Sequence, residues 1–153
     1  MKFNNMIAEA LFSSKSDEWT TPQNLFYELN KEFNFKLDAA ATAENSKCTY
    51  FIDKETNALT RSWKLFNTDK TTVWLNPPYS MCKEFIKKAY EESLEGNTIV
   101  ALVPSRTDTK WFHEYVYNNP NVEIRFIKGR LKFGDSKNSA PFPSMIVIFK
   151  PVK

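Results

Sequence analysis

The tetrapeptide Asn76-Pro77-Pro78-Tyr79 combines groups that suit a reaction at an aromatic amine such as that of adenine. The lone pair of this amine is delocalised into the ring, so the nitrogen must rehybridise before it attacks an electrophile. Two acceptors aimed at its two N–H bonds favour that change, and the Asn76 side-chain oxygen and the Pro77 carbonyl can supply them. The prolines hold the turn rigid, and Tyr79 offers a stacking face. The alternative is structural: Pro-Pro ends a strand and Tyr79 fills the core.

The elements that would position this tetrapeptide follow from the spacing of apolar residues. The predicted strands are Phe35–Asp38, Thr72–Leu75, Thr98–Val103, Val122–Ile127, Arg130–Phe133 and Ser144–Phe149. The predicted helices are Pro22–Phe33, capped by Thr21, then Met81–Leu94, closed by Gly96, and a third that follows Asp108 and presents Trp111 and Val116. Residues 42–70 are expected to be irregular, with one short helix.

This alternation predicts an α/β fold with one mostly parallel sheet, closed at its edge by an antiparallel hairpin. Ligands of such sheets bind beyond the carboxyl ends of the strands, which places Asp38 and Asn76 along one rim. With 153 residues, of which 42% are hydrophobic, we expect a single domain over residues 1–153 whose residues 1–16 are flexible.

Several classes of protein are excluded by composition. No apolar run approaches the roughly 20 residues that span a bilayer, and the first residues lack the features of a secretion signal. The two cysteines, Cys48 and Cys82, are far apart and lack the spacing of zinc ligands. We therefore expect a cytoplasmic protein with no membrane association and no metal.

Positive charge is concentrated near the carboxyl terminus. The net charge is +3, but residues 121–153 carry 7 basic and 2 acidic groups. Such a segment suits a polyanion, although a solvated surface would look the same. Arg130 and Lys132, together with Arg106, are the predicted contacts to DNA phosphates.

Separated blocks along the chain, in order, resemble those of the phage-type DNA N-6-adenine-methyltransferase (Dam) family, which uses S-adenosylmethionine. The resemblance runs from about residue 17 to residue 150. Its blocks are Asp17–Pro22, Asp38–Ala40, Asn76–Tyr79, Val103-Pro104 with Thr109–His113, and Gly129–Phe133 with Ala140–Ser144. Protein glutamine methyltransferases share the Asn-Pro-Pro-Tyr tetrapeptide, so the ordered set is the stronger signature.

The resemblance implies a Rossmann-like class I methyltransferase sheet and methyl transfer from S-adenosylmethionine to the N6 amino group of an adenine flipped out of double-stranded DNA. It implies that the catalytic residues are Asn76, Pro77, Pro78 and Tyr79. It implies that the cofactor-binding residues are Trp19, Thr21, Pro22, Asp38, Ala39, Ala40 and Asn76. Recognition of the target would fall to loops such as 42–70 and 134–143 or to a second subunit, which leaves monomer and homodimer open.

One departure from the family pattern keeps other functions open. The loop Asp38-Ala39-Ala40-Ala41 contains no glycine, whereas glycines let the backbone of most methyltransferases approach the cofactor. A methyltransferase fold that has lost the cofactor and only binds DNA is therefore one alternative. Methyl transfer to a protein glutamine or to adenine in RNA is another.

Overall fold

The computed structural model describes residues 19–66, 68–134 and 137–152, so the predicted flexible segment 1–16 lies outside the described residues. The helices are α3 (Gln23–Phe33) and α4 (Cys82–Leu94), with short turns at η1 (Ala58–Thr60), η2 (Tyr79–Met81) and η3 (Phe112–Val116). The strands are β1 (Leu37–Asp38), β2 (Tyr50–Phe51), β3 (Thr72–Leu75), β4 (Thr98–Pro104), β5 (Val122–Phe126) and β6 (Ser144–Phe149).

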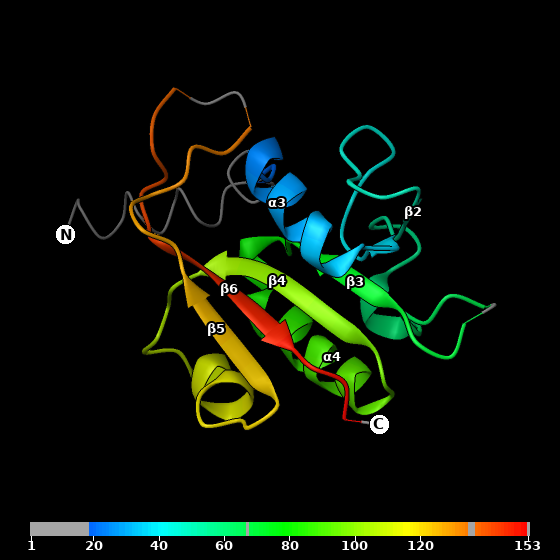
Figure 1. Cartoon of the computed structure of the whole chain (residues 1–153). Helices are drawn as coiled ribbons and strands as arrows, with labels where there is room; N and C mark the ends of the chain where they lie inside the picture. Colours follow the sequence, from blue (N-terminus) through cyan, green and yellow to red (C-terminus); the bar gives the residue numbers. More distant parts are fainter. Residues whose placement is uncertain (1–18, 67, 135–136, 153) are drawn as a thin grey trace.

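These strands form one sheet in the order β2-β1-β3-β4-β6-β5 (Figure 1). The first four strands in this order are mutually parallel. β6 runs antiparallel to both of its neighbours, β4 and β5. The predicted α/β fold, mostly parallel with antiparallel strands at the carboxyl terminus, is therefore confirmed.

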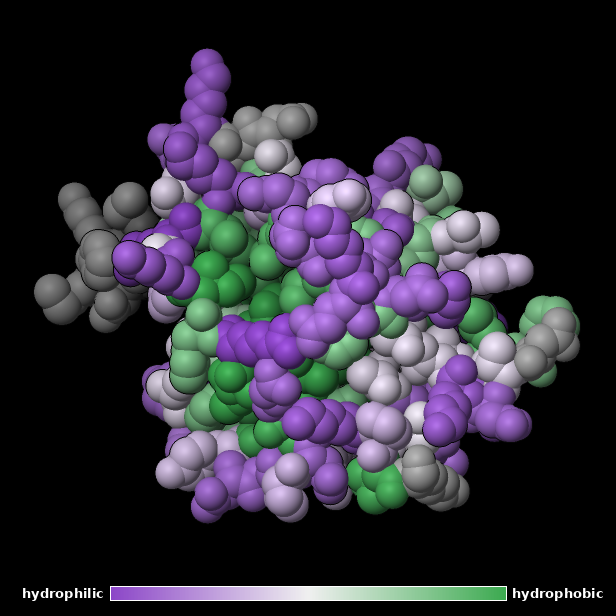
Figure 2. Space-filling view, viewed as in Figure 1, coloured by the Kyte–Doolittle hydropathy of each residue, from purple (hydrophilic) through white to green (hydrophobic). Residues whose placement is uncertain are grey.

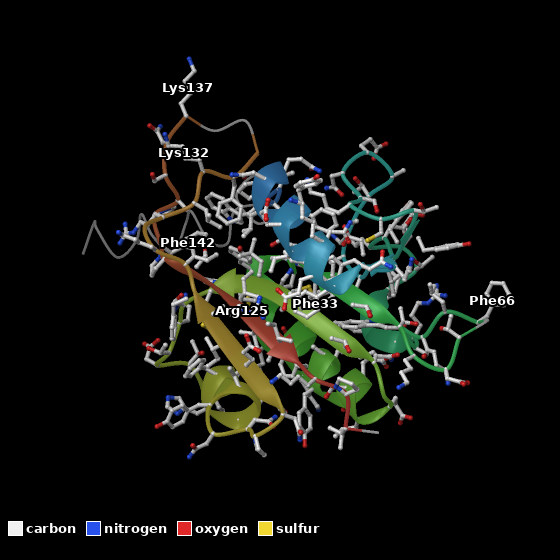
Figure 3. The ribbon with its side chains drawn as sticks, viewed as in Figure 1. Phe33, Phe66, Arg125, Lys132, Lys137 and Phe142 are labelled. Atoms are coloured by element: carbon white, nitrogen blue, oxygen red, sulfur yellow. The ribbon has the colours of Figure 1, made fainter. Side chains whose placement is uncertain are left out.

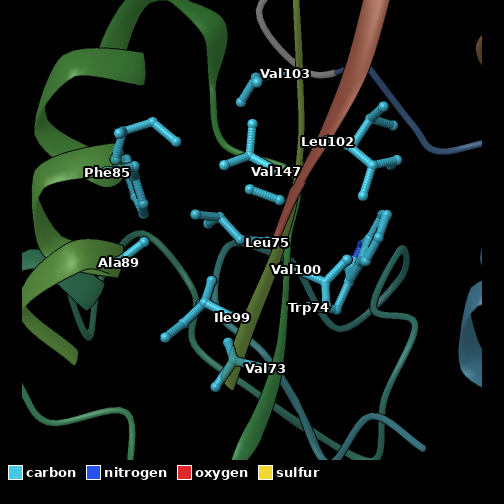
Figure 4. Close-up of a cluster of buried hydrophobic side chains, with 14 of the residues drawn as sticks. Val73, Trp74, Leu75, Phe85, Ala89, Ile99, Val100, Leu102, Val103 and Val147 are labelled. Carbon is cyan, nitrogen blue, oxygen red and sulfur yellow. The ribbon is translucent and has the colours of Figure 1, made fainter. Parts of the chain in front are cut away.

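The core lies on both faces of the central strands because their sequences are apolar without interruption. Val73, Leu75, Ile99 and Val147 are fully buried, as the continuous apolar runs predict. Figure 4 shows Leu75, Ile99 and Val147 directed toward Phe85 and Ala89 of α4, whereas Trp74, Val100 and Leu102 point to the opposite face. The alternation along each strand thus supplies apolar side chains to two layers at once.

Helix α3 covers the face opposite α4 (Figure 1). Its Phe26 ring lies 5.5 Å from that of Phe35 and 5.4 Å from that of Trp74, measured between centroids. Across this face, Arg125 of β5 donates two hydrogen bonds of 2.7 Å to the carboxylate of Glu32. Figure 2 shows a hydrophilic band crossing an apolar area here, and Figure 3 labels Arg125 at the same place. The pair holds α3 over the antiparallel end of the sheet.

A buried polar network joins α4 to the segments that precede β3 and β4. Glu92 is 5% exposed and accepts hydrogen bonds from the Trp63 backbone N–H (2.8 Å) and from Asn97 Nδ2 (3.0 Å). Its second oxygen pairs with Lys88 Nζ at 3.0 Å. Asn97 Oδ1 accepts from the Thr71 backbone N–H at 2.9 Å. These buried polar atoms therefore have partners, as a stable interior requires.

The predicted strand Arg130–Phe133 is wrong. These residues form no ladder, and one hydrogen bond of 2.7 Å, from Ala140 N to the Leu131 carbonyl, joins the two arms of the loop 127–143. The reason is that β6 already pairs with β4 on one side and β5 on the other. No strand edge of β6 remains for a further partner, whatever the local pattern favours.

Three smaller predictions also need correction. Pro22, not Thr21, is the cap of α3, and no side chain caps that helix. Residues 42–70 contain the short strand β2 as well as η1, the single short helix that was predicted there. The helix expected after Asp108 is present but short: Lys110 and Trp111 are α-helical and lead into the five-residue π-helical turn η3, with Trp111 and Val116 buried.

Candidate active site

Parallel pairing brings the ends of β1 and β3 to the same edge of the sheet. Asp38, the last residue of β1, lies opposite Trp74, so that Asn76 follows one residue beyond the end of β3. The segment before α3 reaches the same edge, because Asn76 contacts both Trp19 and Thr21. Three of the predicted blocks therefore meet here, as the topology rule for parallel sheets requires.

The amide of Asn76 is held by its nitrogen. Nδ2 donates a short hydrogen bond to the Trp19 carbonyl and a second, of 3.1 Å, to Thr21 Oγ1. A carbonyl oxygen can only accept, so the nitrogen must face Trp19 and the side-chain oxygen must face away from it. That oxygen, Oδ1, is buried and has no partner among the described residues. Asn76 Oδ1 is thus a fixed acceptor that none of the described residues satisfies. It carries the free-energy cost of desolvation without a compensating hydrogen bond.

Thr21 is the partner that sequence reasoning did not foresee. It is 3% exposed, and its hydroxyl accepts from Asn76 instead of from the helix that it precedes. Only the Thr-Pro block pointed to this position, and it did not reveal which group the hydroxyl would contact.

The two prolines of the tetrapeptide use their carbonyls differently. The Pro78 carbonyl accepts from Met81 N at 2.8 Å, which begins the turn η2. Pro77 is buried, and no backbone N–H among the described residues donates to its carbonyl. The main-chain oxygen that the sequence selects as a second acceptor is thus not the one that begins the turn η2.

Tyr79 lies in a cluster of four aromatic rings that also contains Trp19, Phe133 and Phe142. The ring planes of Trp19 and Tyr79 are within 17° of parallel, with centroids 6.3 Å apart. Phe142 meets both rings nearly edge-on, at 5.2 Å from Trp19 and 5.3 Å from Tyr79. Burial raises the pKa of the Tyr79 hydroxyl well above its usual value, so it stays protonated. The cluster is closed, and a planar ligand can stack on Tyr79 only after its neighbours separate.

Two polar atoms of this cluster are also buried without partners among the described residues. They are the indole nitrogen Nε1 of Trp19 and the hydroxyl oxygen of Tyr79. Ser144 Oγ, at the start of β6, is a third such atom. With Asn76 Oδ1, unsatisfied buried polar groups gather around one edge of the sheet, which marks it as a candidate site.

Asp38 is a buried carboxylate at the end of β1. It is 3% exposed, and its oxygens accept from the backbone N–H groups of Lys47 (3.0 Å) and Ala40 (3.3 Å). Burial raises its pKa to about 6, and these two hydrogen bonds reduce the rise. Ala39, directly after it, is fully buried, so a larger side chain would have no room. The glycine-free loop is therefore closely packed against its neighbours.

The predicted phosphate contacts lie on exposed loops. Arg106 follows β4, and Arg130 and Lys132 lie on the loop 127–143. In Figure 3, Lys132 and Lys137 project outward at the top of this loop, with Phe142 below them. No ion pair of these basic residues is found within the described ranges, in contrast to Arg125, which is bound to Glu32. Their charges remain available to a polyanion.

Two searches for other features found nothing in the part of the chain that the structure describes. No helix there has both the length and the apolar composition to cross a membrane. No group of three or more His, Cys, Asp or Glu side chains is placed to hold a metal ion.

The chain was compared with known proteins. Over 107 residues it is 41% identical to a DNA N-6-adenine-methyltransferase of Escherichia phage T1, a match that covers 69% of this chain but 43% of the relative. Over 146 residues it is 33% identical to a DNA N-6-adenine-methyltransferase of Haemophilus phage HP1, covering 90% of this chain and 81% of the relative. Among solved structures, a SAM-dependent O-methyltransferase from Thermotoga maritima has 11% identity and a TM-score of 0.47, covering 96% of this chain and 72% of that one.

The profile of one protein family matches nearly the whole chain. It spans residues 9–153, and its description is DNA N-6-adenine-methyltransferase (Dam). The match includes the tetrapeptide, the Thr-Pro segment and the loop 127–143 described above. The chain belongs to this family of DNA N-6-adenine-methyltransferases.

Proposed function

We propose that the protein transfers a methyl group from S-adenosylmethionine to the N6 amino group of an adenine that is flipped out of double-stranded DNA. The observation that carries the proposal is the Asn76 side chain, whose nitrogen is bonded and whose oxygen is buried with no partner among the described residues. Such an acceptor fits a ligand that donates an N–H bond, and an aromatic amine is one such ligand. Family membership supports the same reaction.

The chemistry requires little of the protein beyond placement. Asn76 Oδ1 and the Pro77 carbonyl accept the two N–H bonds of the amine, which moves lone-pair density from the ring onto nitrogen. The nitrogen would then attack the methyl carbon in line with the sulfur–carbon bond that breaks, and S-adenosylhomocysteine would leave as a neutral thioether. The methylated nitrogen would lose one of its N–H protons to solvent, and no covalent intermediate with the protein forms. Because the acceptors are fixed before the base arrives, little reorganisation accompanies the reaction.

Asp38 is the group we assign to the cationic end of the cofactor. S-adenosylmethionine would supply a methyl group activated on a sulfonium, and it also carries an ammonium. A carboxylate whose pKa is raised to about 6 by burial is costly to ionise alone, and a bound cation reverses that cost. Thr21, Pro22, Ala39 and Ala40 would line the same end. The donor set therefore fits the cofactor.

Tyr79 would receive the flipped base. Stacking on an aromatic side chain contributes about 1–3 kcal/mol, comparable with the few kcal/mol needed to unstack and unpair a base. The cluster around Tyr79 must open to admit the base, and the basic residues Arg106, Arg130 and Lys132 would hold the DNA backbone near it.

The test is methyl transfer from labelled S-adenosylmethionine to unmethylated double-stranded DNA, with RNA and protein acceptors in parallel. We expect transfer to DNA, with Asn76→Ala about 100-fold slower than wild type, the usual effect of removing one preorganised polar group. Asn24→Ala, which removes an exposed asparagine of α3, is the matched control and should retain the wild-type rate.

Sequencing of methylated adenines in the product would then give the recognition sequence. Absence of transfer to DNA by the wild type would refute the proposed function. If calorimetry then detected no binding heat at millimolar S-adenosylmethionine, the DNA-binding alternative would be favoured. Equal rates for wild type and Asn76→Ala would refute the assigned mechanism alone.

A further inference from the structure

The indole N–H of Trp19 is a buried donor that the reaction described above leaves unused. Nε1 has no partner among the described residues, although a buried N–H normally finds one. The Trp19 backbone is fixed beside the reacting group, because its carbonyl accepts from Asn76 Nδ2. The unpartnered donor and the unpartnered acceptor Asn76 Oδ1 therefore come from two residues in direct contact.

The ring geometry limits where a base stacked on Tyr79 can lie relative to Trp19. Stacked bases are about 3.4 Å apart, so a base between two parallel rings needs them about 6.8 Å apart. The Trp19 and Tyr79 centroids are 6.3 Å apart, and the spacing of the ring planes cannot exceed that distance. A base sandwiched between them would not fit at the observed spacing.

A base that stacks on Tyr79 is instead expected beside the indole. It would be parallel to Tyr79, and Trp19 is within 17° of parallel to Tyr79, so the indole and base planes would be nearly parallel to each other. An N–H bond lies in the plane of the indole, and the lone pairs of purine ring nitrogens lie in the plane of the base. Near-parallel planes therefore allow an N–H···N hydrogen bond between the two edges when the base lies at the level of the indole ring.

From these observations we infer that Trp19 is a specificity-determining residue whose indole N–H donates to a ring nitrogen of the target adenine. This inference rests on the proposed function. Adenine presents an amino donor next to a ring-nitrogen acceptor, N7 on one side and N1 on the other. Asn76 Oδ1 matches the donor and Trp19 Nε1 matches the acceptor, so the two residues together recognise the adenine edge.

The Trp19 ring is also held from the loop 127–143. Phe133 and Phe142 meet it nearly edge-on, with centroids 5.3 and 5.2 Å away. Gly134 N donates to the carbonyl of Thr20 at 2.8 Å. Before a base enters, these contacts hold the indole in one direction and leave its nitrogen unused, and the hydrogen bond of the Trp19 carbonyl keeps its backbone in place when the rings separate.

The experiment is a double-mutant cycle in which one partner is changed in the protein and the other in the DNA. Trp19→Phe removes the N–H and keeps an aromatic ring, and replacement of Trp19 by 3-benzothienylalanine removes the N–H and keeps the bicyclic shape. DNA carrying the recognition sequence would contain adenine, 1-deazaadenine, 3-deazaadenine or 7-deazaadenine at the target position. Single-turnover methylation rates are measured at saturating cofactor and DNA.

We expect the wild-type methylation rate to be about tenfold lower on either 1-deazaadenine or 7-deazaadenine, the two analogues that lack a ring nitrogen beside the amino group. Both Trp19 replacements should methylate adenine about tenfold more slowly than wild type, with no further loss of rate on that analogue. The analogue that shows this pattern identifies the contacted nitrogen as N1 or N7. Phe133→Leu, which disturbs packing on Trp19 without removing a donor, is the control and should slow all four substrates equally.

Equal losses on all four substrates for both Trp19 replacements would overturn the inference and assign Trp19 a packing role. A raised KM for S-adenosylmethionine with unchanged preference among the bases would overturn it in favour of the cofactor contact that the family resemblance implies. Absence of transfer to adenine by the wild type would instead refute the proposed function, and the inference with it.

Discussion

Two buried polar clusters lie at opposite ends of the parallel strands, and they differ in how their hydrogen bonds are completed. Around Glu92, at the end where β3 and β4 begin, each carboxylate oxygen has a partner and the Asn97 amide uses both its nitrogen and its oxygen. Around Asn76, where β1 and β3 end, the amide uses only its nitrogen, and further polar atoms nearby are unpartnered among the described residues.

This difference separates residues that stabilise the fold from residues that await a ligand. A completed network recovers the desolvation cost of its polar groups inside the protein, so its removal should act on stability. An incomplete one leaves that cost unrecovered until a ligand binds, so its removal should act on activity. Three experiments test this difference between the two clusters.

The largest effect is expected from Glu92→Ala. The change leaves the Trp63 N–H and the Asn97 amide without their acceptor and Lys88 without its partner, so we expect the free energy of unfolding to fall by about 4 kcal/mol. Chemical denaturation measures it. Glu91→Ala, an exposed neighbour on the same helix, should change that energy by less than about 0.5 kcal/mol. Similar losses in the two variants would contradict the structural role of the network.

The second effect is a pH dependence at Asp38. Its folded pKa is raised to about 6 by burial, against 3.8 for the unperturbed group. Between these two pH values the folded protein therefore binds more protons than the unfolded chain. The contribution of Asp38 to the free energy of unfolding falls as pH rises from about 4 to 6. A cofactor ammonium selects the ionised carboxylate, so affinity for S-adenosylmethionine should rise about tenfold from pH 5 to pH 7.

Calorimetry at several pH values measures this affinity, and buffers of different ionisation enthalpy report the proton released on binding near pH 6. Asp38→Asn should remove the pH dependence. Wild-type affinity that stays constant from pH 5 to 7, with no proton released, would exclude Asp38 as the partner of the ammonium.

The smallest effect is expected from Thr21→Val, which removes the hydroxyl that accepts from Asn76 Nδ2. One neutral hydrogen bond contributes about 1 kcal/mol, so the methylation rate at saturating substrates should fall about fivefold. Thr21→Ser keeps the hydroxyl and should restore most of the rate. If the valine and serine variants were equally slow, Thr21 would act through packing and not through the orientation of Asn76.

Much of the architecture could be predicted because its strands are long and apolar. Residues Thr72–Leu75 form β3 with the predicted bounds, and β4 extends its predicted range by one residue. The strand β2 was missed because two residues give no measurable periodicity. Arg130–Phe133 was wrongly predicted as a strand because alternation is a local signal, whereas pairing depends on which strand edges are free.

The sequence indicated which residues form the candidate site, but it did not indicate which of them contact one another. The tetrapeptide and Asp38 could be found because strand ends in parallel sheets share an edge. The contacts of Asn76 with Thr21 and with the Trp19 carbonyl could not, since they join segments 55 and 57 residues apart. Nor does a single sequence reveal that Glu92 and Asn97 complete each other's hydrogen bonds, because both read as ordinary surface types.

The main chain at residues 19–20 connects the Asn76 side chain to the loop 127–143. Its consecutive carbonyls accept from two different segments: that of Trp19 from the amide of Asn76, and that of Thr20 from Gly134, which follows the basic residues Arg130 and Lys132. Under the proposed function, a phosphate backbone bound by that loop would be linked to Asn76 through a single peptide unit. On this proposal, DNA binding by the loop and orientation of the Asn76 amide would depend on the same short stretch of backbone.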